Sequence, residues 1–119
     1  MKFSMTVPMQ TNEYMLTVRL AVGAICEAKG FDIDSAEDYK VSVNESILIL
    51  QRGGYRGVTL VFEEENGLKV TVSGEEKGES EKDEIENEIS YALLGALVDE
   101  VAVERENGAA KRIVLNKSL

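Results

Sequence analysis

One long helix that stops at two adjacent glycines constrains this chain most. Its apolar positions recur every three or four residues, as on one face of a helix, and they are Tyr39, Val43, Ile47 and Leu50. Asp34 or Ser35 is the expected N-cap, and Gly53-Gly54 ends the pattern. We predict a helix over this stretch with its apolar stripe facing a core.

Glu45 lies in this helix but outside the stripe. It comes two residues after Val43 and therefore points to another side, whereas Ile49, four residues further on, shares its face. A carboxylate in so apolar a run needs an ionic partner, a water-filled cleft or a catalytic role. The role of Glu45 is the question that this sequence poses.

The other segments alternate between strand and helix patterns. Residues 2–7 read as a strand, and a first helix follows that ends at Gly30. Two hairpins turn at Asn-Gly pairs, and their strands span residues 57–64 with 68–73 and residues 98–104 with 110–115.

Between the hairpins, a third helix carries an apolar stripe with a spacing of four, formed by Ile85, Ile89, Leu93 and Leu97. The order β-α-α-β-β-α-β-β predicts an α+β fold, a two-layer sandwich with the helices on one face of a mostly antiparallel sheet. The 119 residues make one domain, 1–119.

Composition excludes several classes of function. Without histidine, metal sites with histidine ligands and Ser–His catalysis are excluded. The net charge of −9 argues against nucleic-acid binding. No apolar run approaches the roughly 20 residues of a membrane span, so we expect a cytoplasmic protein that binds no membrane. The lone cysteine, Cys26, is expected in the core.

Several short motifs, in order, resemble those of the anti-sigma factor serine kinases. Val41–Ser46 looks like the family's "VSEA" run, Gly54-Tyr55 like its "HGY", and Leu97–Val101 like its "LMDEV". That family belongs to the histidine-kinase-like (GHKL) ATPases, which share the Bergerat fold with Hsp90-type proteins. The resemblance covers nearly the whole chain and implies the same fold.

The resemblance also implies where a nucleotide site would lie. The family's general base, a glutamate, corresponds to Glu45, but its Mg²⁺-binding asparagine corresponds to Ile49. The family's Asp-x-Gly-x-Gly loop, which recognises adenine, corresponds to residues 74–78. Gly74 stands in place of its aspartate, Glu76 in place of its first glycine, and only the last glycine is kept, as Gly78. The phosphate-binding glycines fall near Glu88 and Ser90.

These changes oppose nucleotide binding. A carboxylate where phosphate would approach repels it, and residues 75–88 hold seven Glu and one Asp against two Lys. Phosphoryl transfer also relies on a bound metal ion, and Ile49 has no ligand atom. We therefore expect no cofactor and no metal, with ATP and Mg²⁺ needed only if the chain is an active kinase.

We predict a non-catalytic regulatory relative of these kinases that binds a protein partner, of the sigma factor or anti-sigma antagonist type. One alternative is an ATP-binding serine kinase with an atypical site that uses Glu45 as its base. Another is a small dimerising domain of unrelated role. A homodimer is also left open, since a first strand at the sheet edge could pair with another chain and the resemblance is to kinases that dimerise. Arg19, on the first helix, is a weak candidate for partner contact, and the acidic residues 75–88 are either solvated or face a basic partner.

Overall fold

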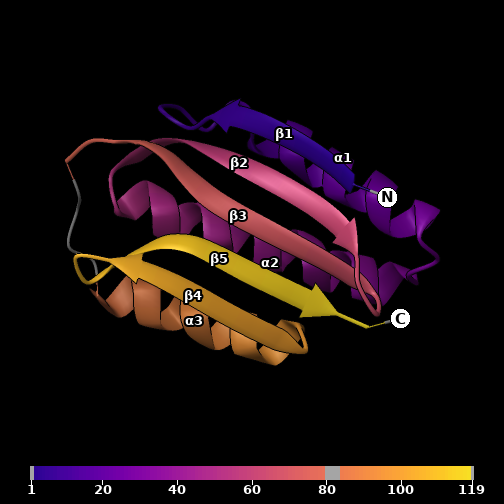
Figure 1. The fold of residues 1–119 in the computed structure, drawn as a ribbon. Helices are drawn as coiled ribbons and strands as arrows, with labels where there is room; N and C mark the ends of the chain where they lie inside the picture. Colours follow the sequence, from indigo (N-terminus) through magenta and orange to yellow (C-terminus); the bar gives the residue numbers. More distant parts are fainter. Residues whose placement is uncertain (1, 80–83, 119) are drawn as a thin grey trace.

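The computed structural model describes residues 2–79 and 84–118. Its elements follow the predicted order: β1 (Lys2–Pro8), α1 (Met15–Ala28), α2 (Ile33–Arg52), β2 (Tyr55–Glu64), β3 (Leu68–Lys77), α3 (Glu84–Leu97), β4 (Glu100–Glu106) and β5 (Ala109–Lys117). The strands form one antiparallel sheet in the order β1-β2-β3-β5-β4. All three helices cover one face of this sheet, with α2 in the middle (Figure 1). The predicted α+β sandwich is confirmed.

The two Asn-Gly turns are formed as predicted. Glu65, Asn66 and Gly67 lie between β2 and β3, whereas Asn107 and Gly108 alone form the two-residue turn between β4 and β5, and both Asn-Gly pairs have positive φ. A two-residue hairpin turn of type I′ requires positive φ at both central residues, and Asn-Gly supplies it at low cost. These turns fix the registers of both hairpins.

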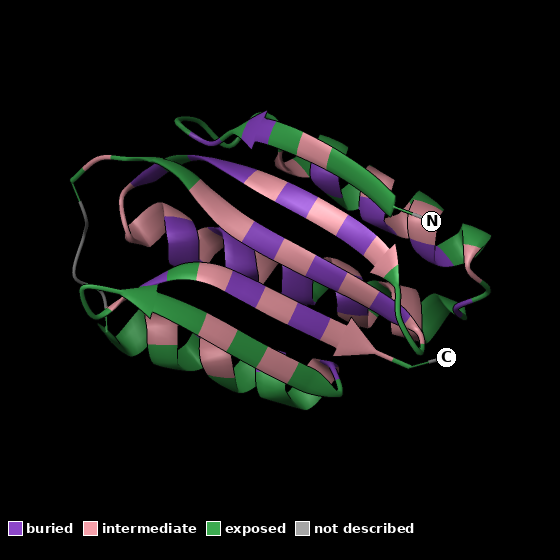
Figure 2. Cartoon of the chain, viewed as in Figure 1, coloured by how far each residue is buried: buried purple, intermediate pink, exposed green. Residues whose placement is uncertain are grey.

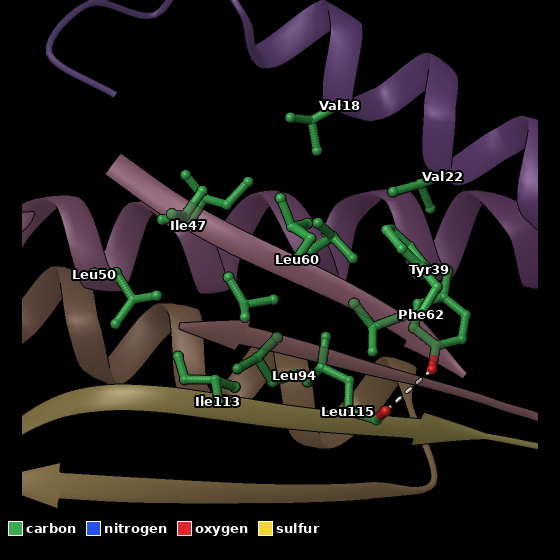
Figure 3. Packing of buried hydrophobic residues seen from close by; sticks show 14 of the residues in the cluster. Val18, Val22, Tyr39, Ile47, Leu50, Leu60, Phe62, Leu94, Ile113 and Leu115 are labelled. Carbon is green, nitrogen blue, oxygen red and sulfur yellow. Dashed lines mark hydrogen bonds between the residues drawn. The ribbon is translucent and has the colours of Figure 1, made fainter. Parts of the chain in front are cut away.

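The core lies between the sheet and α2. The predicted stripe of α2 is fully buried and meets apolar side chains of the central strands, including Leu60, Phe62, Ile113 and Leu115 (Figure 3). From α1, Val18 and Val22 complete the core together with the buried Cys26. Each such side chain stabilises the fold by about 1.5–3 kcal/mol when fully buried.

Tyr39 ties α2 to the sheet. Its side chain is fully buried, and its hydroxyl proton is shared between the main-chain oxygens of Leu68 in β3 and Leu115 in β5. Figure 3 draws the bond to Leu115. Burial raises the pKa of this phenol well above its ordinary value. The hydroxyl therefore stays protonated and bonded.

Two local predictions were wrong. The N-cap of α2 is Asp32, whose side chain accepts from the Ser35 N–H at 2.8 Å, and not Asp34 or Ser35. The second strand of the first hairpin was predicted to end at Ser73, but β3 continues to Lys77.

Helix α3 is formed as predicted, and the structure adds the direction of its apolar stripe. Its stripe faces outward: Ile85, Ile89 and Leu93 are 72%, 52% and 37% exposed. Much of α3 is coloured as exposed in Figure 2. The helix buries Ser90 and Leu94 instead. The sequence spacing identified which residues share a face, but not the direction in which that face points.

Candidate functional site

The segment that corresponds to the family's adenine-binding loop, residues 74–78, is strand as far as Lys77. Gly74 pairs with Val58 of β2, and Glu75 pairs with Gly57. Glu76 has a positive φ of 53°. The cross-strand ladder with β2 overrides the low strand propensity of glycine and glutamate here. The backbone here is thus paired with β2 and does not form a free loop.

Tyr55 fills the space over Gly74. A Cβ added to Gly74 would lie 2.4–2.6 Å from the Cγ, Cδ1 and Cδ2 atoms of the Tyr55 ring, which is only 8% exposed. The Nζ of Lys77 lies over the same Tyr55 ring, 4.9 Å from its centroid. The side chain that would have recognised adenine from position 74 has no room in this packing.

Gly78 is held against the end of α2. Its N–H donates to the main-chain oxygen of Gly54 at 2.7 Å. A side chain on Gly54, whose φ is +94°, would meet the main-chain oxygen of Glu79 at 2.6 Å. The glycine pair that ends α2 thus allows the end of β3 to pack closely. Gly78 serves this backbone contact.

Ile49 belongs to the core. It is 2% exposed and is part of the buried apolar cluster that α2 shares with the sheet. Burial of an isoleucine in such a cluster stabilises the fold, but leaves nothing at this position that could hold a cation. Among the described residues, no three His, Cys, Asp or Glu side chains are grouped as metal ligands.

Glu45 joins a polar contact between α2 and α3. Its Oε1 accepts from the Ser90 hydroxyl at 3.1 Å, and that hydroxyl accepts from Arg52 Nη1 at 3.0 Å. Arg52 Nη1 also donates to Asn87 Oδ1 at 3.1 Å. Opposite charges on Glu45 and Arg52 are therefore joined through one buried hydroxyl. Glu45 therefore has a polar partner in Ser90 and reaches the charge of Arg52 through that hydroxyl.

The remaining predicted residues lie apart from this contact. Glu88 is exposed on α3, whereas Ser90 is buried. Arg19 is exposed on α1, and α2 separates α1 from α3 (Figure 1). Glu76 lines a hollow of about 510 Å³ near the ends of β1, β2 and β3, together with Thr59 and Glu75. The structure does not gather these residues around one cleft.

Two residues that matter here were missed in the sequence. These are Arg52 and Tyr55, which flank the glycine pair. Tyr55 was noted only as part of the Gly54-Tyr55 motif, and Arg52 was not singled out. The signal for Tyr55 was an aromatic residue at the start of one strand and a glycine in the neighbouring strand, since aromatic rings cover strand glycines. The signal for Arg52 was its position seven residues, or about two helical turns, after Glu45.

Cys26 is no candidate nucleophile. Its side chain is fully buried, and burial raises the pKa of its thiol to about 11 despite the nearby Lys40. The thiolate is the reactive form of cysteine, and a buried thiol with a raised pKa is inert. Cys26 has a structural role in packing α1.

Comparison with protein-family models and with curated proteins identifies no relative. No protein-family model matches the sequence, and no curated protein matches it significantly. In the described part of the chain, no helix is both long and apolar enough to cross a bilayer.

The site residues do not fit Mg²⁺–ATP. Three requirements that the family resemblance implies are a metal ligand, an adenine-binding carboxylate and a free glycine-rich loop. At those positions lie the buried Ile49, the covered Gly74 and a paired strand. The arrangement supplies packing and hydrogen bonds between elements, and Glu45 is engaged in them.

Proposed function

We propose that this chain is a non-catalytic regulatory protein that binds a protein partner and that retains the scaffold of the anti-sigma factor serine kinases without their nucleotide chemistry. The observation that carries the proposal is the Tyr55 ring packed on Gly74. The partner class that the resemblance suggests is a sigma factor or an anti-sigma antagonist, which places the protein in the cytoplasm.

An active kinase is disfavoured by the state of Glu45. A general base must reach the hydroxyl whose proton it takes, and the Oε1 atom of Glu45 accepts from Ser90. Phosphoryl transfer also needs its charge neutralised, usually by a metal ion, and Ile49 contributes no ligand. A regulatory role requires only a stable surface.

Thermal unfolding with ATP and Mg²⁺ tests the proposal. A ligand that binds only the folded state raises its stability by RT ln(1 + [L]/Kd). We expect no change in melting temperature at millimolar ATP–Mg²⁺. A rise that disappears in the Glu45→Ala variant, or transfer of labelled phosphate to a protein serine, would refute the proposal and favour the kinase alternative.

Size-exclusion chromatography with light scattering tests the remaining alternative, a domain whose role is to dimerise. The proposal expects a monomer in the absence of a partner. A stable dimer at micromolar concentration would favour the dimerising domain.

A further inference from the structure

Helix α3 packs with its apolar face toward solvent, the reverse of an ordinary surface helix. Such a helix buries its apolar stripe and exposes its polar residues. In α3, Asn87 and Ser90 face α2 and bind Arg52, while Ile85, Ile89 and Leu93 face outward. The helix therefore exposes its largest side chains and buries a hydroxyl.

The outward stripe is continuous. Residues four apart lie one above another on a helix, so Ile85, Ile89 and Leu93 form a row of about 12 Å at 1.5 Å per residue. Ala92 and Ala96, also exposed, lie beside this row on the helix. We call these five residues the α3 stripe. An exposed apolar patch of this kind commonly marks an interaction site.

The helix that carries the α3 stripe is itself acidic. Helix α3 carries three glutamates and no lysine or arginine. Glu84 and Glu88, both exposed and four residues apart, form a row along one side of the stripe. Glu86 lies on the other side, and its Oε2 is 4.0 Å from Arg52 Nη2. An apolar row beside carboxylates complements an apolar row beside ammonium or guanidinium groups.

We propose that the α3 stripe binds an amphipathic helix of a protein partner, one with an apolar seam at four-residue spacing and lysine or arginine beside it. This inference rests on the proposed protein-binding function and gives the chemistry of the partner. Helix against helix is a common recognition mode, in which the apolar seam supplies most of the contact. The flanking charges set the choice and orientation of the partner.

A second copy of this chain fits the stripe less well. It would bring the same glutamates, and each copy has a net charge of −9. The apolar hollow between α1 and α2 of a second copy could receive the stripe, but its charged lining is mainly acidic. It contains one lysine, Lys40, and three carboxylates, Glu27, Asp32 and Glu37. Like charges facing each other across an interface are unfavourable. The glutamates beside the α3 stripe would also be repelled by an anionic lipid surface.

The test uses two labelled synthetic peptides of about 18 residues, long enough to form a helix once bound. Both have a leucine seam at four-residue spacing, flanked by lysine in one and by glutamate in the other. Fluorescence anisotropy with the whole chain measures affinity. We expect the lysine peptide to bind at least about tenfold more tightly than the glutamate peptide, a difference of about 1.4 kcal/mol.

Matched variants locate the binding site. Ile89→Asp should abolish binding of the lysine peptide even though it adds a negative charge, because it breaks the apolar row. Leu20→Asp is the control: it adds the same charge at a 65% exposed leucine of α1 and should leave binding unchanged. The double variant Glu84→Lys with Glu88→Lys should reverse the preference between the two peptides. Ile85→Ser replaces Ile89→Asp if circular dichroism shows that the latter unfolds.

Several results would overturn the inference. The lysine peptide could fail to bind, or it could bind Ile89→Asp and wild type equally, which would indicate general attraction to an acidic protein. A wild-type dimer that Ile89→Asp dissociates would assign the stripe to a second copy. Binding to vesicles of anionic phospholipid that Ile89→Asp removes would assign it to a membrane. None of these outcomes involves ATP, so they are distinct from a failure of the proposed function.

Discussion

Adding one methyl group to Gly74 should destabilise the protein. The change is Gly74→Ala, and its Cβ would lie 2.4 Å from the Cγ of Tyr55 and 2.5–2.6 Å from both Cδ atoms. Carbon atoms in contact prefer separations of about 3.5–4.0 Å. The ring must therefore retreat by about 1 Å or more. Rotation about the ring axis leaves Cγ in place, so the backbone or the χ1 angle of Tyr55 has to change.

The magnitude follows from the packing of the site. Inserting a methyl group into a well-packed interior costs about 1–3 kcal/mol, and the position of Cγ close to the backbone favours the upper half of that range. The matched control is Gly95→Ala in α3, where an added Cβ meets nothing within 4 Å. Replacing a helical glycine with alanine stabilises by about 0.5–1 kcal/mol. The same substitution should thus have opposite signs at the two positions.

Urea unfolding followed by circular dichroism measures both variants. A double-mutant cycle adds Tyr55→Ala, which removes the ring and costs about 3–5 kcal/mol itself. In that background Gly74→Ala should cost close to nothing, because the methyl group then enters space that the ring has left. The reasoning is refuted if Gly74→Ala is as stable as wild type, or if its cost is the same with and without Tyr55.

Other predictions concern buried polar groups, and urea unfolding measures each one. Ser90→Ala should cost about 1–2 kcal/mol, because Arg52 and Glu45 lose the hydroxyl that joins them; an unchanged midpoint would contradict that role. Tyr39→Phe should cost a similar 1–2 kcal/mol or so, since two main-chain oxygens lose their donor; a variant as stable as wild type would count against this tie between α2 and the sheet. The Cys26 thiol ionises near pH 9 when unfolded and near 11 when folded, so above pH 9 the unfolded state releases its proton first. Relative to Cys26→Ala, wild type should lose roughly 1–3 kcal/mol between pH 9 and 11, and parallel pH profiles would contradict this.

Local signals in the sequence were sufficient for the fold. The two Asn-Gly pairs specify hairpin turns through their backbone preferences alone, and the stripe from Tyr39 to Leu50 specifies a helix through its period. Alternation of such elements leaves few architectures. The order of the elements and their two layers were therefore predicted.

The site depends on contacts between segments that are distant in sequence. Whether Gly74 is covered depends on the register that brings Tyr55 over it. The direction of α3 depends on Ser90, which bonds both Arg52 and Glu45 on the neighbouring helix. Periodicity gives the face that residues share, and the partner of that face is decided by tertiary packing. For this reason the α3 stripe was predicted as a pattern but not as an exposed surface.

A nuclear magnetic resonance titration with ATP–Mg²⁺ tests the central claim most directly, because it reports on each position of the presumed nucleotide site separately. The account predicts that the backbone amide signals of Glu45, Gly74 and Gly78 stay in place at millimolar nucleotide. Saturable shifts of these signals with a micromolar Kd would contradict it, since they would mean that Tyr55 and Ile49 give way to a nucleotide.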